Sequence, residues 1–131
     1  MTTAAVGGRV VDPGALSNLI DGIAIAVAFM AVAEHLGITL LVPDVVWAEV
    51  TALRPADSAA FAQLRRHPMV IVPYLTPGEA DGVLRSQQTA DVFDGPAGVV
   101  SYWARSRGWT ILTGDPDRIR HVDRHADLQR L

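Results

Sequence analysis

The chain has 131 residues, half of them hydrophobic, and a net charge of −3 with the histidines neutral. This length predicts a single domain over residues 1–131 with a core of its own. Cysteine and lysine are absent, which excludes disulfides, thiolate catalysis, cysteine-bound zinc, a P-loop lysine and Schiff-base chemistry. The negative charge argues against bulk attraction to nucleic acid, so any such binding needs a local basic patch.

The first half of the chain alternates short apolar runs with helical segments. Continuous apolar runs at residues 8–12 and 38–43 predict buried strands, because a strand covered on both faces lacks the polar alternation of a half-exposed one. Most of the helical segments begin at proline or aspartate, and glycine follows the longest of them, as is usual at helix starts and ends. We expect these helices at residues 13–20, 21–36, 44–53 and 56–66.

The most apolar run, IAIAVAFMAVA at residues 23–33, lies within the second of these helices. It is shorter than the roughly 20 residues that a bilayer span requires, and no basic segment opens the chain. We therefore expect no membrane span and no signal peptide, and a cytoplasmic protein. Burial in the core is the first interpretation of this helix, and a dimer interface or a groove for a partner's helix is the alternative.

The second half continues the alternation of strand and helix. A β-branched run at 69–74 predicts a third strand, and Thr76-Pro77-Gly78-Glu79 has the form of a capping box that opens a helix to about residue 85. We then expect a polar loop at 86–93, a helix from Asp94 or Gly95 to 107, a strand at 109–114, a helix at 116–122 and an edge strand at 127–131. This order predicts a three-layer α/β/α sandwich around a mainly parallel sheet of about four or five strands.

Four acids stand where such a sheet forms sites, outside the carboxyl ends of its strands. Asp12 ends the first strand, Asp115 follows the fourth, Glu49 lies in the helix after the second, and Asp94 begins a helix. Each has a structural explanation, since the three aspartates suit helix N-caps and Glu49 suits a solvated face. Taken together, however, gathered carboxylates repel one another without a cation, and their hard oxygens suit Mg²⁺ or Mn²⁺.

The stretches VVDPGAL, LVPDVVWAEV and DVFDGPAGVVSYWARSRGWTILTGDPDR, in this order and spacing, resemble the PIN-domain family. The chain is most similar to the VapC-type toxins of bacterial toxin–antitoxin pairs, and the resemblance covers residues 9–131. It implies a PIN-like fold and a Mg²⁺- or Mn²⁺-dependent ribonuclease whose ions activate water against an RNA phosphodiester. Toxins of this family usually dimerise and bind an antitoxin, so the resemblance also implies a homodimer and a protein partner.

Carried over residue by residue, the resemblance assigns the family's acids to positions of this chain. The catalytic acids would be Asp12, Glu49, Asp94 and Asp115, with the three aspartates as metal ligands. Asp91 is a nearby competitor for the third acid, Asp117 would assist the fourth, and Thr113 matches the small polar residue before it. The basic residues that follow Asp115 would contact an RNA backbone near the site, namely Arg118, Arg120 and Arg124.

The chain departs from the family pattern in two places. Gly14 stands where the family often has serine or threonine, and the helix after the third acid begins Asp94-Gly-Pro-Ala and is about one turn longer than expected. These departures favour an alternative function, a catalytically impaired PIN-fold protein that acts as a protein- or nucleic-acid-binding module. In a third interpretation, the aspartates of an α/β domain only cap helices.

Overall fold

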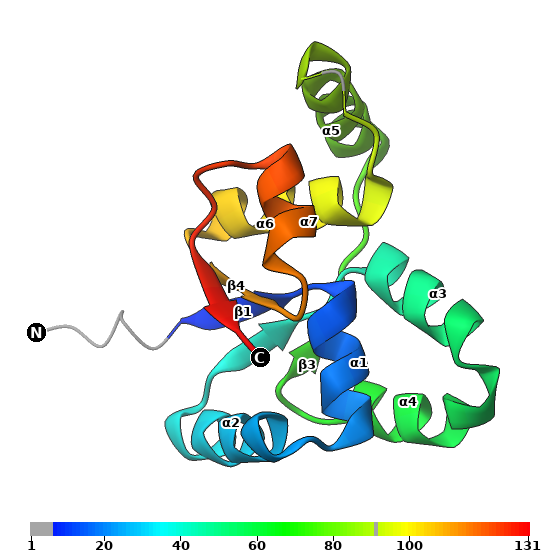
Figure 1. The fold of residues 1–131 in the computed structure, drawn as a ribbon, viewed down its shortest axis with the longest axis vertical. Helices are drawn as coiled ribbons and strands as arrows, with labels where there is room; N and C mark the ends of the chain where they lie inside the picture. Colours follow the sequence, from blue (N-terminus) through cyan, green and yellow to red (C-terminus); the bar gives the residue numbers. More distant parts are fainter. Residues whose placement is uncertain (1–6, 91) are drawn as a thin grey trace, which may run out of the picture.

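The computed structural model describes residues 7–90 and 92–131, so Asp91 lies outside the described residues. Within these ranges, five parallel strands form one sheet in the order β3-β2-β1-β4-β5 (Figure 1). The strands are β1 Gly8–Val11, β2 Thr39–Leu41, β3 Val70–Ile71, β4 Thr110–Thr113 and β5 Leu128–Arg130. The register pairs Val10 with Leu41 of β2 and with Ile111 of β4, so the carboxyl ends of the central strands lie at one edge.

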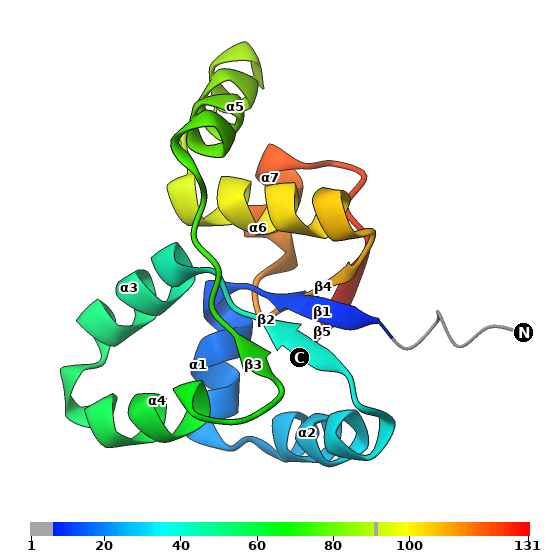
Figure 2. The ribbon, with the colours of Figure 1, turned by 180° about the vertical axis from the view of Figure 1, so that it is seen from behind.

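Helices cover both faces of the sheet, as Figures 1 and 2 show from opposite sides. Helices α1, α2 and α4 lie on one side and α6 and α7 on the other, while α3 packs against both α1 and α6. The bounds are α1 Pro13–Asp21, α2 Ala24–Leu36, α3 Asp44–Leu53, η1 Pro55–Asp57 (a 3₁₀ turn), α4 Ser58–Arg65, α5 Pro77–Ala90, α6 Gly95–Arg107 and α7 Pro116–Val122. The predicted three-layer α/β/α fold is therefore confirmed.

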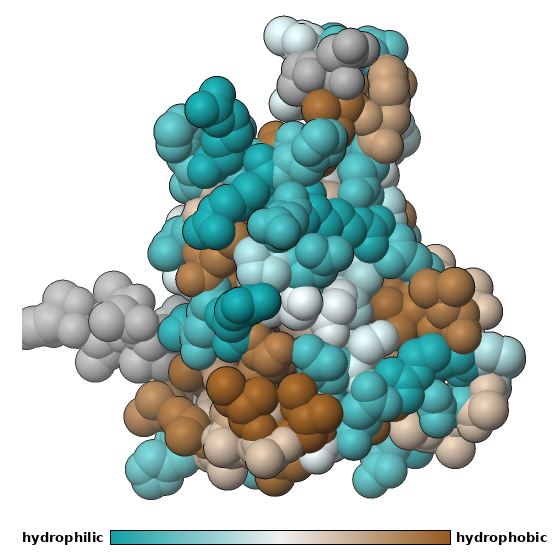
Figure 3. Space-filling view, viewed as in Figure 1, coloured by the Kyte–Doolittle hydropathy of each residue, from teal (hydrophilic) through white to brown (hydrophobic). Residues whose placement is uncertain are grey.

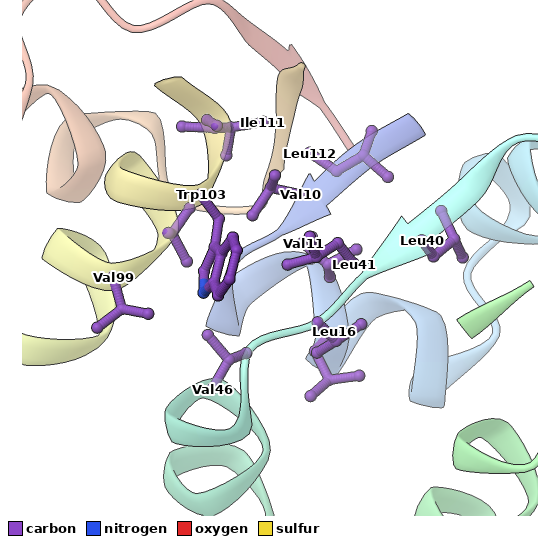
Figure 4. Packing of buried hydrophobic residues seen from close by; sticks show 14 of the residues in the cluster. Val10, Val11, Leu16, Leu40, Leu41, Val46, Val99, Trp103, Ile111 and Leu112 are labelled. Atoms are coloured by element: carbon purple, nitrogen blue, oxygen red, sulfur yellow. The ribbon is translucent and has the colours of Figure 1, made fainter. Parts of the chain in front are cut away.

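The core occupies both faces of the three central strands (Figure 4). Six apolar residues of these strands are at most 1% exposed, namely Val10, Val11, Leu40, Leu41, Ile111 and Leu112. Leu16 packs into this cluster from α1, and Trp103 enters it from α6. Each such side chain, when fully buried, contributes about 1.5–3 kcal/mol. Burial on both faces explains why the strands are continuously apolar in sequence.

Three local boundaries differ from the sequence prediction. The helix expected over 21–36 is confirmed from Ala24 to Leu36 but begins three residues late, because Gly22 adopts a left-handed conformation (φ 65°) that ends α1 at Asp21, and the chain bends by 96° before α2. The third strand is limited to Val70–Ile71. The expected loop at 86–93 is wrong in its first part, since α5 continues to residue 90. The buried Gln87 amide donates to the carbonyl of Asp94, and this tertiary contact anchors the added turn on the start of α6.

Helix α5 begins as predicted and then leaves the body of the protein. The backbone N–H of Thr76 donates to the Glu79 carboxylate (2.9 Å), and the N–H of Glu79 donates to the Thr76 hydroxyl (3.2 Å). This reciprocal pair is the predicted capping box. Beyond it, α5 packs on α6 and projects past it (Figures 1 and 2).

The first interpretation of the apolar run in α2, burial in the core, is wrong for most of its side chains. Ala26 and Ala33 face the core, but four larger residues are at least half exposed, namely Ile25, Val27, Val32 and Leu36. Figure 3 shows an apolar patch over the region of α2. Among the described residues no single helix is long and apolar enough to cross a membrane; α1 and α2 together pass that test of length and composition, across their sharp bend.

The exposure of α2 predicts unequal effects of two apolar substitutions. Val27→Gln should change the free energy of unfolding by less than about 0.5 kcal/mol, because the side chain is already in water. Leu40→Ala should cost about 2–5 kcal/mol, because it leaves a cavity in the central sheet. Urea denaturation measures both values, and a large loss for Val27→Gln in the isolated protein would contradict the exposed position of α2.

Candidate metal centre

Asp12 is the most deeply buried of the predicted acids, with 1% of its surface exposed. Its backbone N–H continues the sheet ladder by donating to the carbonyl of Leu112 (3.0 Å). One carboxylate oxygen, Oδ1, accepts from the backbone N–H of Ala15 (2.8 Å) and of Gly114 (3.1 Å). The other, Oδ2, accepts from the hydroxyl of Thr113. A single carboxylate therefore joins the end of β1, the start of α1 and the end of β4.

Burial raises the pKa of Asp12 above its ordinary value of 3.8, because the charged form is removed from water. The hydrogen bonds from Thr113, Ala15 and Gly114 oppose this shift, and the nearby charge of Asp115 adds to it. All three donors are neutral groups, and no salt bridge joins Asp12 to a basic residue in the described part of the chain. The environment of Asp12 thus lacks the positive charge that would stabilise its ionised form.

Thr113 links Asp12 to Asp115. Its buried hydroxyl donates to Asp12 and accepts from the backbone N–H of Asp115 (2.9 Å). Asp115 is exposed and caps α7, since its Oδ1 accepts from the backbone N–H of Arg118 (3.3 Å). Thr113, which matches the small polar residue before the last acid in the resemblance, thus places its hydroxyl between the Asp12 carboxylate and the backbone of Asp115.

Two glycines explain how the loop after β4 reaches Asp12. A Cβ atom on Gly114 would lie 2.6 Å from the carbonyl carbon of Gly14, and a Cβ on Gly14 would lie 2.9 Å from the backbone of Gly114. The two backbones are therefore in contact, and this approach is open only to residues without a side chain. The departure from the family pattern at Gly14 has a physical reason in this structure.

The other two acids are held by one arginine. The guanidinium of Arg118 donates to both oxygens of Glu49 (2.7 and 2.8 Å) and to both oxygens of Asp94 (2.7 and 2.9 Å). These are two bidentate ion pairs that tie α3 and the start of α6 to α7. Asp94 also caps α6, because its Oδ1 accepts from the N–H of Ala97 (3.2 Å).

The pKa shifts of this group follow from the guanidinium. Hydrogen bonds from Arg118 hold the pKa of Asp94 below its ordinary value of 3.8, against the opposing effect of burial. Hydrogen bonds to Glu49 and then to Asp94 raise the pKa of Arg118. The guanidinium therefore stabilises the ionised form of Asp94, whereas burial disfavours the ionised form of Asp12. Two predicted acids near the same edge of the sheet thus have opposite electrostatic environments.

All four predicted acids belong to one connected network. Asp12 contacts Thr113, Thr113 contacts Asp115, and Asp115 contacts the backbone of Arg118, whose side chain holds Glu49 and Asp94. The three aspartates do cap helices, as the simplest interpretation expects, but capping uses only part of each carboxylate. Capping and a role in a site are therefore compatible.

The donor set fits a divalent ion in part. Carboxylate oxygens are the ligands that Mg²⁺ and Mn²⁺ prefer, and neither Asp12 nor Asp115 forms an ion pair within residues 7–90 and 92–131. The oxygens of Glu49 and Asp94 are taken by the guanidinium of Arg118. Accordingly, no group of three or more acids or histidines is arranged to hold an ion among the described residues. Of the four acids, Asp12 and Asp115 are therefore the ones whose carboxylates are not held by a basic side chain in the described residues, and Glu49 and Asp94 are accessible to an ion only if Arg118 moves.

The remaining predicted residues lie around Asp115. A hollow beside it is lined by Asp117 and Arg120, both predicted, and by Arg130, which the sequence argument missed. Arg130 comes from β5, and only the pairing of β5 with β4 brings it there. Arg124 is exposed after α7 and does not line this hollow.

Comparison with solved structures gives an informative likeness. A chain in the crystal structure of VapBC2 from Rickettsia felis, bound to a DNA fragment from their promoter, has the same fold with a TM-score of 0.67. The match covers 94% of this chain and 98% of that chain at 9% sequence identity. No family model and no curated protein matches the sequence. The likeness supports the PIN-like fold predicted from the motifs, and at this identity it shows the fold alone.

The raised pKa of Asp12 predicts a pH-dependent effect of Asp12→Asn. An acid whose pKa is higher in the folded state binds more protons there, so the metal-free wild type loses stability as pH rises from 3.8 through the raised value. The asparagine variant lacks this loss. Urea unfolding from pH 4 to pH 8 should show the stability of Asp12→Asn, relative to wild type, rising with pH and then levelling. A constant difference across that range would show that burial does not affect this carboxyl.

The glycine contact predicts that Gly114→Ala destabilises the protein by about 1–3 kcal/mol, because a Cβ would overlap the backbone of Gly14. The matched control is Gly82→Ala within α5, where a Cβ meets nothing within 4 Å. That variant should be more stable than wild type by about 0.5–1 kcal/mol, since alanine favours a helix interior. Thermal unfolding of the two variants compares them directly, and equal effects would disprove the close approach.

Proposed function

We propose that this chain is a Mg²⁺- or Mn²⁺-dependent ribonuclease and the toxin of a toxin–antitoxin pair. The observation that carries the proposal is the acidic network at the carboxyl ends of β1 and β4. Its centre is Asp12, a buried carboxylate that is hydrogen-bonded only by neutral groups. A buried charge without a cation is costly, and a divalent ion at this point removes that cost.

The proposed roles follow from the placement of each side chain. Asp12 and Asp115 hold the ion, Thr113 fixes their relative position, and Asp94 is the third ligand. Glu49 completes the acidic crevice from α3. When bound, the ion would lower the pKa of a bound water and stabilise charge on the phosphate under attack. The start of α7 contributes both Asp115 and Arg118, so this turn sets much of the geometry of the proposed site.

Substrate contacts are proposed at the hollow beside Asp115. Arg120 and Arg130 line it, and arginine at such a position binds the sugar–phosphate backbone without reading bases. The negative net charge of the whole chain makes this local pair more significant, because bulk attraction to RNA is absent. Contacts of Arg118 and Arg124 with RNA remain predictions from the sequence.

The partner assignments belong to the same proposal. The structurally similar chain comes from a complex named VapBC2, and its crystal structure contains promoter DNA. On this chain, the exposed apolar residues of α2 form the kind of surface that monomers rarely leave in water. These two observations support a protein partner, with a homodimer and an antitoxin as the expected assemblies.

A second candidate function is a binding module without catalysis. The specific observation in its favour is Arg118, which neutralises two of the four acids from within the chain. If that arrangement is permanent, the remaining aspartates serve as helix caps and ties between strands. The two functions differ in whether the crevice takes up a divalent ion.

Ion binding is therefore the deciding measurement. We expect titration calorimetry to show saturable binding of Mn²⁺ by the wild type and none by Asp12→Asn or Asp115→Asn, because each change removes a charged ligand. The same two variants should lose Mn²⁺-dependent cleavage of RNA. Calorimetry comes first because a negative cleavage assay only shows that the RNA chosen was not a substrate.

The matched control is Asp81→Asn, which removes an exposed carboxylate from α5, well away from the network. It should bind Mn²⁺ like the wild type. Absence of binding by both the wild type and Asp81→Asn would reject the proposed metal centre in the resting protein. Equal binding by all variants would place the ion elsewhere.

A further inference from the structure

Arg118 has a place in the acidic crevice that neither the helix dipole nor a substrate contact explains. Its guanidinium makes four hydrogen bonds of 2.7–2.9 Å, and they engage every carboxylate oxygen of Glu49 and Asp94. Its fork shape matches two carboxylates at once, which a lysine could not do. The guanidinium of Arg118 thus occupies the position where the proposed function requires a metal ion from solution.

A guanidinium and a divalent ion cannot share these oxygens. An ion that binds Glu49 and Asp94 replaces the hydrogen bonds of Arg118 and repels its positive charge. Conversely, with Arg118 in place, Asp12 and Asp115 are the two of these four acids whose oxygens form no ion pair within residues 7–90 and 92–131. The two occupants therefore exclude each other at half of the acidic network.

The ion pairs are open enough to exchange. The side chains of Arg118, Glu49 and Asp94 are 28%, 26% and 22% exposed, so water reaches all three. A fully buried guanidinium would be locked in place by the cost of leaving its partners unpaired. Here the long arginine side chain can turn toward solvent while the carboxylates are rehydrated or take up another cation.

We propose that Arg118 is an internal competitor for the metal ion, which holds Glu49 and Asp94 in the ion-free protein and leaves them when a divalent ion binds. This inference rests on the proposed function, because it requires a divalent ion to enter the same crevice. It assigns to Arg118 a role distinct from the RNA contact predicted from the sequence.

The test is Mn²⁺ titration calorimetry on Arg118→Gln beside the wild type. Because the competitor is gone, Arg118→Gln should bind Mn²⁺ more tightly by on the order of tenfold or more. Without ion, Glu49 and Asp94 then face each other without a cation, so Mn²⁺ should raise the Tm of Arg118→Gln more than that of the wild type. Both readouts measure binding and require no substrate.

Three further variants make the result specific. Arg118→Lys keeps the charge but not the two bidentate pairs, so its affinity should lie between the other two, and it also serves if Arg118→Gln folds poorly. Arg124→Gln removes the same charge from an exposed position outside the network and should leave the affinity near that of the wild type. The double variant Asp12→Asn/Arg118→Gln should not bind.

The outcomes separate this inference from the function on which it rests. Tighter binding by Arg118→Gln that is lost in the double variant supports competition, including the case in which the wild type binds too weakly to detect. If the wild type binds Mn²⁺ as tightly as Arg118→Gln or more tightly, the competition is disproved but the proposed metal centre is not. Absence of binding by the wild type, Arg118→Gln and Arg118→Lys overturns both.

Discussion

The Asp12 carboxylate is the constraint on which this part of the structure depends. It caps α1, accepts from the backbone of the loop after β4, and accepts from the Thr113 hydroxyl, so it closes the central two strands at their carboxyl ends. A leucine or valine there would bury more apolar surface but would leave two backbone N–H groups without acceptors. Burial raises the pKa of this carboxyl, and the same contact that stabilises the edge of the sheet therefore stores an electrostatic cost there.

Much of the architecture could be predicted from local patterns. Asp-Pro and Asp-Gly-Pro marked the starts of α1, α6 and α7, and continuous apolar runs marked strands covered on both faces. Two failures are tertiary in origin, since Gln87 extends α5 by reaching across to α6 and the apolar residues of α2 face outward. The late start of α2 is local, because Gly22 in a left-handed conformation ends α1 at Asp21. Periodicity and propensity say little about a side chain whose partner is far along the chain.

The candidate site shows the same division. Strand-end aspartates were predictable, because parallel topology brings the carboxyl ends of β1 and β4 together. The pairing of Arg118 with Glu49 and Asp94 was not predictable from the sequence. Arg118 is 69 residues from Glu49 and 24 residues from Asp94 along the chain, and the fold alone brings the three together. Arg130 was missed for a similar reason, as it lines the hollow beside Asp115 only because β5 pairs with β4. Charge balance within a crevice is a property of the assembled fold.

The contact between Gly14 and Gly114 ties two positions that are distant in the chain. A serine or threonine at position 14, as the resembling family often has, does not fit against this backbone unless the loop after β4 is displaced. The displaced loop would carry Asp115 with it. Positions 14 and 114 are therefore coupled, because a side chain at either one must displace the other backbone and, with it, the loop that carries Asp115.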